Sequence, residues 1–193
     1  MKKKLEIQLS KLKQLEEFDL DLEQYTTDSS QASEILLWAY NNRDIENKII
    51  ADFGCGNGIL GIGALLLNAK KVYFIDNDKK AIKITKENTK TGEFILDDIS
   101  NFSKPIDTVI MNPPFGVRNR KADKIFLETA MKYAKSIYSI HKIESKGFIN
   151  KLCKENNFKI ETIKEFKILL KKTQKFHKKE KYYVHVGCWY LKL

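Results

Sequence analysis

The sequence predicts an α/β fold: a seven-stranded, mostly parallel sheet that ends in an antiparallel C-terminal hairpin, with helices on both faces. Three observations lead to this prediction. From Lys48 onward, short apolar runs alternate with segments of helical periodicity, which is typical of parallel sheets with helical crossovers. One apolar run leads directly into a glycine-rich turn at residues 54–58 and then into a helix, as in doubly wound folds. The last two strand patterns are joined by a short basic loop without a helix, so these strands should pair antiparallel.

The individual elements follow from hydrophobic periodicity, taken in chain order. Leucines at helical spacing between residues 5 and 15 predict an amphipathic helix over residues 2–17. Asp28 and Gln31 resemble a capping box for a helix over residues 29–41. Strands are expected over residues 49–53, 72–76, 93–97, 106–111, 137–140, 158–169 and 182–191, and further helices over residues 59–68, 78–90, 122–135 and 144–156.

Length and composition favour a single domain. At 193 residues, with 42% hydrophobic side chains, the chain can bury a normal core. We therefore expect residues 1–193 to form one domain. Residues 1–47 would be a helical N-terminal extension, and residues 48–193 would be the catalytic core that contains the sheet.

Charge, cysteines and apolar runs narrow the class of protein. No apolar run reaches transmembrane length, and the basic residues 2–4 lead into a charged helix rather than an apolar signal core. We therefore expect a cytoplasmic protein that does not enter a membrane. The three cysteines are scattered and odd in number, which argues against a disulfide framework or a metal site. The net charge of +10 favours a polyanionic partner, although a lysine-rich proteome would give the same composition.

The glycine-rich turn is the first candidate site. Gly54, Gly56 and Gly58 let the backbone turn tightly and approach a ligand closely, and Cys55 lies between the first two. A dinucleotide-binding turn is the alternative, but its usual spacing is G-x-G-x-x-G. Asp52, two residues before the first glycine, would repel a pyrophosphate and would hold a cofactor that carries an ammonium group.

Carboxylates at the ends of the next two strands extend this site. Asp76 ends the second strand, where a carboxylate can accept both hydroxyls of a ribose. Asp78 is more simply the N-cap of the following helix. After the third strand, Asp97 or Asp98 could accept an adenine amino group while Ile99 packs on the ring, and a plain strand-end turn is the alternative. The series fits S-adenosylmethionine.

The sequence Asn112-Pro113-Pro114-Phe115 follows the apolar strand of residues 106–111 and indicates the chemistry. An exocyclic base amine is a poor nucleophile, so an enzyme must position it and favour its rehybridised form. The Asn112 side-chain oxygen and the Pro113 carbonyl can accept the two amine hydrogens, and both dipoles help more as positive charge develops on the nitrogen. Phe115 offers a face on which a base can stack. A plain Asn-Pro-Pro turn is the structural alternative.

Basic residues gather in three loops that should leave the same edge of the sheet as the methyl donor site. The loops follow the fourth, fifth and sixth strands, and together they suggest a track for a nucleic-acid backbone. Solvated lysine-rich loops are the alternative. The histidines of these loops are expected to contact phosphate or base, because the chemistry needs no general base. The predicted RNA-binding residues are Arg118, Arg120, Lys121, His141, Lys142, Lys175, Phe176, His177, Lys178 and Lys179.

The chain also resembles a known family in motifs spread over nearly its whole length. The five crossovers followed by a hairpin match the Rossmann-like fold of class I methyltransferases. The motifs are similar to those of the small archaeal and eukaryotic rRNA adenine-N6 methyltransferases, called methyltransferase-like five in humans. These motifs are Leu22–Thr27, Asp44–Lys48, Asp52–Gly56, Asn112–Gly116, Tyr138–Lys142 and Lys175–Lys179.

This resemblance implies that S-adenosylmethionine methylates N6 of one adenosine in small-subunit rRNA. It implies that Gln24, Tyr25 and Thr27 cover the cofactor as a lid, although Thr26 stands where the family usually has proline. Eukaryotic members need a small zinc-binding activator that pairs with an edge strand, which is expected here at Glu93–Leu96. The predicted catalytic residues are Asn112, Pro113, Pro114 and Phe115, and the predicted cofactor-binding residues are Gln24, Tyr25, Thr27, Asp52, Gly54, Cys55, Gly56, Gly58, Asp76, Asn77, Asp97, Asp98, Ile99 and Asn112.

Two other functions stay open from the sequence. The Asn-Pro-Pro chemistry also suits DNA adenine or a glutamine amide in a protein, although a protein substrate does not explain three basic loops. A non-catalytic RNA-binding protein with a relic fold is the other alternative. Such a relic would be expected to have lost cofactor residues, whereas Asp52, the glycines, Asp76 and Asn112 are all present.

Overall fold

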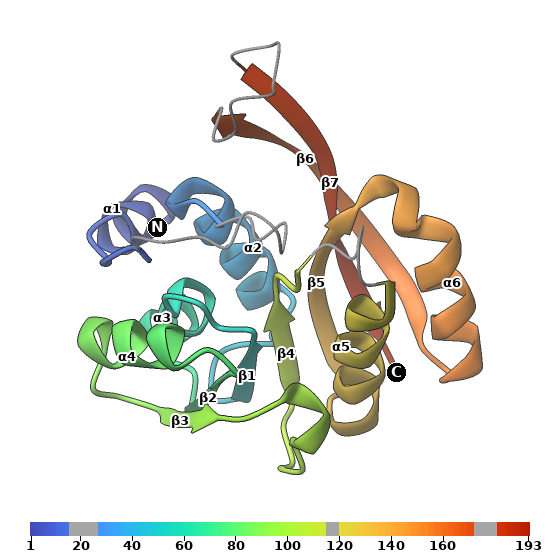
Figure 1. The fold of residues 1–193 in the computed structure, drawn as a ribbon, viewed down its shortest axis with the longest axis horizontal. Helices are drawn as coiled ribbons and strands as arrows, with labels where there is room; N and C mark the ends of the chain where they lie inside the picture. The colour runs from blue at the N-terminus through green and yellow to red at the C-terminus, as the bar shows by residue number, and fades with distance from the viewer. Residues whose placement is uncertain (16–26, 115–119, 172–180) are drawn as a thin grey trace.

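The structure, a computed structural model, describes residues 1–15, 27–114, 120–171 and 181–193. Its centre is a seven-stranded sheet in the order β3-β2-β1-β4-β5-β7-β6 (Figure 1). β3, β2, β1, β4 and β5 are parallel, whereas β7 pairs antiparallel with both β5 and β6. The predicted fold class is therefore confirmed. The strands are β1 (Ile49–Phe53), β2 (Lys71–Asp76), β3 (Glu93–Leu96), β4 (Thr108–Met111), β5 (Ser136–Lys142), β6 (Lys159–Lys171) and β7 (Lys181–Lys192).

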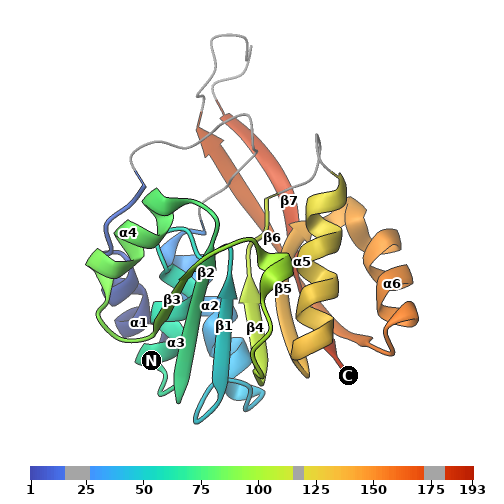
Figure 2. The ribbon, with the colours of Figure 1, turned by 60° about the horizontal axis from the view of Figure 1, so that its bottom comes forward.

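Helices connect most of the strands, as the alternating pattern predicts. The parallel strands lie side by side in Figure 2, and β6 and β7 extend beyond them as a long hairpin. The link between β3 and β4 carries only the short 3₁₀ helix η2 (Ile99–Asn101). The other helices are α1 (Lys2–Leu9), α2 (Ser29–Asn41), α3 (Ile59–Leu66), α4 (Lys79–Asn88), α5 (Arg120–Tyr133), η3 (Ile143–Ser145) and α6 (Lys146–Glu155).

Residues of β1, β2 and β4 alternate between two hydrophobic cores, one on each face of the sheet. Ile50 and Phe74 belong to the core that contains α1, α2 and α3. Their neighbours Ala51 and Tyr73 belong to the core that contains α5 and α6. Successive side chains of a strand point to opposite faces, so burial on both faces explains why most positions of these strands are apolar instead of alternating with polar ones.

The N-terminal helix is shorter than its leucine periodicity predicts. α1 ends at Leu9, although residues up to 17 were expected to continue it. The chain leaves the helix because its backbone finds other partners. Lys13 N–H donates to the side-chain oxygen of Asn88 (2.9 Å) instead of to a carbonyl of the preceding turn.

A buried carboxylate ties the segment before β1 to the amino ends of β4 and β5. Asp44 accepts hydrogen bonds from Ser136 Oγ (3.0 Å) and Tyr138 Oη (2.8 Å). Its backbone carbonyl accepts a third bond from Thr108 Oγ1 (2.7 Å). This network holds the strands at the end of the sheet opposite the candidate site and leaves their carboxyl ends available for a ligand.

Candidate cofactor and methyl-acceptor site

The predicted site residues of four parallel strands come together at one edge of the sheet. Asp52 lies in β1, Asp76 ends β2, Asp97 follows β3 and Asn112 follows β4. These strands are neighbours in the sheet. In open sheets of this kind, ligands bind beyond the carboxyl ends of the strands, so this edge is the candidate site.

The glycine turn needs its glycines for backbone conformation and for space. The backbone φ angles of Gly54, Gly56 and Gly58 are positive, at 67°, 55° and 83°. Residues other than glycine rarely adopt such angles. A Cβ at Gly58 would lie 2.7 Å from Thr85 Cγ2. The N–H of Gly54 also donates to the carbonyl of Ile75 (2.8 Å), which fixes the turn to the end of β2.

Asp52 is a buried carboxylate directly beneath this turn. It is only 1% exposed, and its Oδ2 accepts a hydrogen bond from Gly61 N–H in α3 (2.7 Å). Burial raises the pKa of Asp52 to about 8, with a further increase from the negative charge of Asp76. A cationic group at this place would favour the ionised carboxylate. The Asp52 carboxylate, with Asp76 nearby, therefore fits the cofactor ammonium group that the sequence predicts.

Cys55, within the turn, is a buried thiol without nucleophilic character. Its Sγ lies 3.7 Å from Thr85 Oγ1, and burial raises the pKa of the thiol well above its ordinary value. A protonated, buried thiol is inert toward electrophiles, so Cys55 can line a cofactor site without being methylated.

Asp76 is held in place by the turn itself. Its Oδ2 accepts from Gly56 N–H (2.9 Å) and its Oδ1 from Asp78 N–H (2.9 Å). Burial raises the pKa of Asp76 while these two bonds oppose the rise. Each carboxylate oxygen has a second acceptor direction, so the group suits a ribose diol. Asp78 is the N-cap of α4, as predicted, and Asn77 is exposed beside it.

The carboxylates after β3 form the strand-end turn that was the alternative to a cofactor contact. Asp98 caps η2 and accepts from Ser100 N–H (2.9 Å) and Ser100 Oγ (2.6 Å). Asp97 accepts from Asp98 N–H (2.7 Å) and from Asn101 (2.8 Å). Both carboxylates are exposed at the site edge, while Ile99 is buried in the core beneath α5. A contact with the cofactor adenine stays a prediction for all three.

Asn112 meets the N-terminal extension at the end of β4. Its Nδ2 donates to Thr27 Oγ1 (3.1 Å), although the two residues are far apart in sequence. Thr27 is buried, Asn112 is half-buried, and Pro113 and Pro114 follow it directly. This bond holds the carboxamide in one orientation, and its oxygen is a hydrogen-bond acceptor, as an amine ligand requires.

His141 does not lie in a surface loop, so its predicted contact with RNA is wrong. β5 was expected to end at residue 140 but continues to Lys142, opposite β7. The imidazole is therefore 1% exposed, lies 2.6 Å from Ser139 Oγ and packs edge-on against Trp189. Burial lowers the pKa of His141 to about 3, which leaves it neutral. Lys142, the last residue of the strand, is partly exposed.

Several predicted residues cannot be compared with the structure. Arg120 and Lys121 open α5, but their side chains lie outside the part of the chain that is described. The following predicted residues also lie outside the described residues: Gln24, Tyr25, Phe115, Arg118, Lys175, Phe176, His177, Lys178 and Lys179. Their assignments stay predictions.

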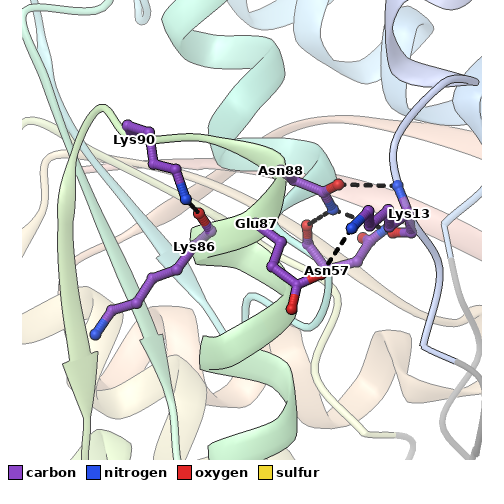
Figure 3. Close-up of polar contacts among 6 residues, drawn as sticks. All are labelled: Lys13, Asn57, Lys86, Glu87, Asn88 and Lys90. Atoms are coloured by element: carbon purple, nitrogen blue, oxygen red, sulfur yellow. Dashed lines mark hydrogen bonds and ion pairs between the residues drawn. The ribbon is translucent and has the colours of Figure 1, made fainter.

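The sequence analysis missed two polar side chains of α4 that support the glycine turn, Thr85 and Asn88, of which Figure 3 shows Asn88. Thr85 Oγ1 donates to the carbonyl of Gly56 (2.8 Å), and Asn88 Nδ2 donates to the carbonyl of Asn57 (3.0 Å). Asn88 also bonds to the backbone of Lys13. The one available signal was Thr85, a polar residue on the otherwise apolar, buried side of α4.

Within residues 1–15, 27–114, 120–171 and 181–193, no helix is long and apolar enough to cross a membrane. The same residues contain no group of three or more His, Cys, Asp or Glu side chains placed to hold a metal ion.

Known proteins are similar to this chain in sequence and in fold. The chain matches the Methyltransferase small domain family over residues 26–185. It is 38% identical to the rRNA N(6)-adenosine-methyltransferase METTL5 of Danio rerio, over 92% of each protein. A proposed RNA methyltransferase from Pyrococcus horikoshii is 39% identical and has a crystal structure that superposes with a TM-score of 0.90, over 99% of this chain and 97% of that one. Magnesium protoporphyrin IX methyltransferase of Synechocystis with bound S-adenosylmethionine shares the fold at 16% identity, with a TM-score of 0.65 over 84% of this chain and 78% of that one.

Proposed function

Because the chain belongs to the Methyltransferase small domain family and uses S-adenosylmethionine, we propose that it methylates N6 of one adenosine in small-subunit ribosomal RNA. The name of the zebrafish relative supports ribosomal RNA and the N6 atom of adenosine. That name does not specify a ribosomal subunit, and the small subunit is part of our proposal. It follows from the sequence resemblance of the N-terminal and C-terminal motifs.

One observation carries the proposal: Asn112 stands at the end of β4 with its amide nitrogen bonded to Thr27. This bond holds the carboxamide in one orientation. The Asn112 side-chain oxygen and the Pro113 carbonyl then accept the two hydrogens of the adenine amine. As the nitrogen becomes tetrahedral and gains positive charge, both dipoles stabilise it more than they stabilise the ground state.

The bound cofactor supplies an activated methyl group on a sulfonium. The amine nitrogen forms the new bond to that methyl carbon, the carbon–sulfur bond breaks, and the sulfur keeps its electron pair as a thioether. The product nitrogen then loses a proton to water. This chain therefore needs no general base, which agrees with a His141 that is neutral and buried away from the surface.

The proposal is tested by mapping modified nucleosides in rRNA from cells that lack the gene. We expect one adenosine of the small-subunit rRNA to lose its N6-methyl group, and we expect the purified protein to restore it. Asn112→Ala should abolish transfer while it leaves S-adenosylmethionine binding nearly unchanged. An unchanged rRNA map, or methylation of DNA adenine or of a glutamine amide in its place, would contradict the proposed substrate.

A small zinc-binding activator stays part of this proposal, with β3 as its docking strand. β3 is one edge of the sheet, and Leu96 at its end is 50% exposed. An exposed edge offers unpaired backbone groups to a partner strand. Copurification with tagged protein tests this idea, and Leu96→Asp should release the partner. If the isolated chain were as active and as stable as its complex with the partner, no activator would be needed. A cytoplasmic location likewise stays a prediction.

A further inference from the structure

We propose that Asn88 is a positioning residue of the cofactor site, which fixes the N-terminal segment at Lys13 to the glycine turn at Asn57. The proposal concerns cofactor binding by this chain and does not depend on which RNA is methylated. Asn88 is the last residue of α4 and contacts neither Asp52 nor Asp76 in any hydrogen bond described above.

The carboxamide of Asn88 joins two separate backbone segments. Its Oδ1 accepts from Lys13 N–H (2.9 Å), and its Nδ2 donates to the carbonyl of Lys13 (3.1 Å). The side chain therefore pairs with both backbone groups of one residue, as a neighbouring strand would. The same Nδ2 donates to the carbonyl of Asn57 within the glycine turn (3.0 Å). Figure 3 shows the carboxamide between the two segments.

Asn57 completes the link from the other side. Its Nδ2 donates to the carbonyl of Lys13 (3.2 Å) and to Gln14 Oε1 (3.3 Å), and its Oδ1 accepts from Ile59 N–H (3.3 Å) at the start of α3. Asn57 is only 5% exposed. The N-terminal segment consequently rests on the turn, where Leu15 Cδ1 lies 4.0 Å from the position of a Cβ on Gly56.

The two bonds from α4 also determine how the glycine turn faces a cofactor. Thr85 and Asn88 are three residues apart and share one side of the helix. They bind the consecutive carbonyls of Gly56 and Asn57. In the same turn, the N–H of Gly56 donates to the Asp76 carboxylate (2.9 Å) at the site. Loss of the Asn88 bond would release one of these two attachments.

An exposed ion pair at the same place provides a matched control. Lys13 Nζ lies 2.9 Å from Glu87 Oε2, but the two side chains are 66% and 40% exposed. Exposed ion pairs contribute little to stability. The Asn88 carboxamide, and not this ion pair, should therefore hold the N-terminal segment at Lys13. Glu87→Gln removes the charge from the neighbouring residue and leaves all bonds of Asn88 in place.

A second control is an asparagine of the same kind far from the site. Asn156 is the C-cap of α6, is half-buried, and donates from Nδ2 to the carbonyl of Leu152 (2.9 Å). Asn156→Ala therefore removes an equivalent side-chain bond at a helix end. It measures how much cofactor affinity is lost through general destabilisation alone.

The experiment measures S-adenosylmethionine binding by calorimetry for Asn88→Ala, Asn88→Asp and the two controls, with thermal melting of each protein. We expect Asn88→Ala to weaken binding about tenfold or more, since all three hydrogen bonds of the side chain are lost. Asn88→Asp keeps an acceptor for Lys13 N–H but loses both donated bonds, so it should be equally weak. Glu87→Gln and Asn156→Ala should bind like the wild type. In a methylation assay, KM for the cofactor should rise while kcat stays within about threefold.

Trypsin provides a readout that is independent of the cofactor. The chain has no lysine or arginine between Lys13 and Arg43, so cleavage after Lys11 or Lys13 reports release of this segment alone. We expect faster cleavage there in Asn88→Ala and an unchanged rate in Glu87→Gln. Wild-type affinity in Asn88→Ala or in Asn88→Asp would overturn the proposal. An equal loss of affinity in Asn156→Ala at the same melting temperature would overturn it too.

Discussion

Asp52→Asn should stabilise the cofactor-free protein at neutral and alkaline pH and weaken its binding of S-adenosylmethionine. The wild-type carboxylate is buried, and its pKa is raised from 3.8 to about 8. Between these two values the folded protein binds a proton that the unfolded chain has already lost. This contribution to stability is therefore complete below pH 3.8 and is lost as the pH rises toward 8. Asparagine is uncharged and still offers an acceptor to Gly61 N–H.

The size of the effect follows from the pKa. One pKa unit corresponds to about 1.4 kcal/mol, so three pH units between pH 5 and pH 8 correspond to at most about 4 kcal/mol. The stability difference between variant and wild type should increase by up to that amount over this range. In the other direction, a cofactor ammonium beside the carboxylate favours ionisation. The variant loses this attraction, so its affinity should fall about tenfold or more.

Urea unfolding of both proteins at several pH values, without cofactor, measures the first effect. The wild-type minus variant difference cancels groups that do not interact with Asp52, whereas Asp76 titrates together with Asp52 because its charge raises the pKa of that carboxyl. Calorimetry in two buffers with different ionisation enthalpies measures the second, because cofactor binding should release a proton from the wild type but not from the variant. A pH-independent stability difference would refute the buried titration, and equal proton release and affinity would refute the ammonium contact.

Three further variants test the site and its support. Gly58→Ala should weaken cofactor binding and cost about 1–3 kcal/mol of stability, because φ is +83° and the new Cβ would meet Thr85; unchanged melting and binding would contradict this. Asp44→Ala should cost about 2–4 kcal/mol in urea unfolding, because buried hydroxyls such as that of Tyr138 lose their acceptor, while cofactor affinity stays unchanged; a large loss of affinity would refute its purely structural role. His141→Gln should remove a loss of stability that the wild type shows as pH falls from 6.5 toward 3, since burial lowers the pKa of His141 to about 3; an identical acid profile of the two proteins would disprove it.

The hydrophobic periodicity of the sequence was sufficient to predict the strands of the sheet and most of the helices around it. Residues 72–75 of β2, for example, are apolar at every position because both faces of the parallel sheet are covered. The same reasoning failed at the ends of elements. Leu12, beyond the end of α1, still packs against the core, while the backbone N–H of Lys13 donates to Asn88. Periodicity reports which face is buried, and it does not report where a backbone N–H finds its partner.

Site residues could be predicted where a residue type has a known role at that place in the fold, and they were missed where it has none. Glycines before a helix and Asp76 at a strand end have a known purpose at that place in the fold. His141 looked like a loop residue because a histidine and a lysine ended an apolar run, but pairing with β7 extends β5 beyond that point. Asn88 gave no local signal at all. Its three partners belong to segments that are brought together only by the fold.

The place of β7 has a consequence for the order in which the protein can form during synthesis. β7 lies between β5 and β6 although it follows both in the chain, and its residues Trp189 and Leu191 are completely buried. Until residues up to about 192 have left the ribosome, β5 must keep an open edge, and such edges are prone to pair with other chains. The half with the glycine turn can begin to fold early, whereas removal of the last ten residues would remove the part of β7 that pairs with β5 and so separate β6 from the other strands.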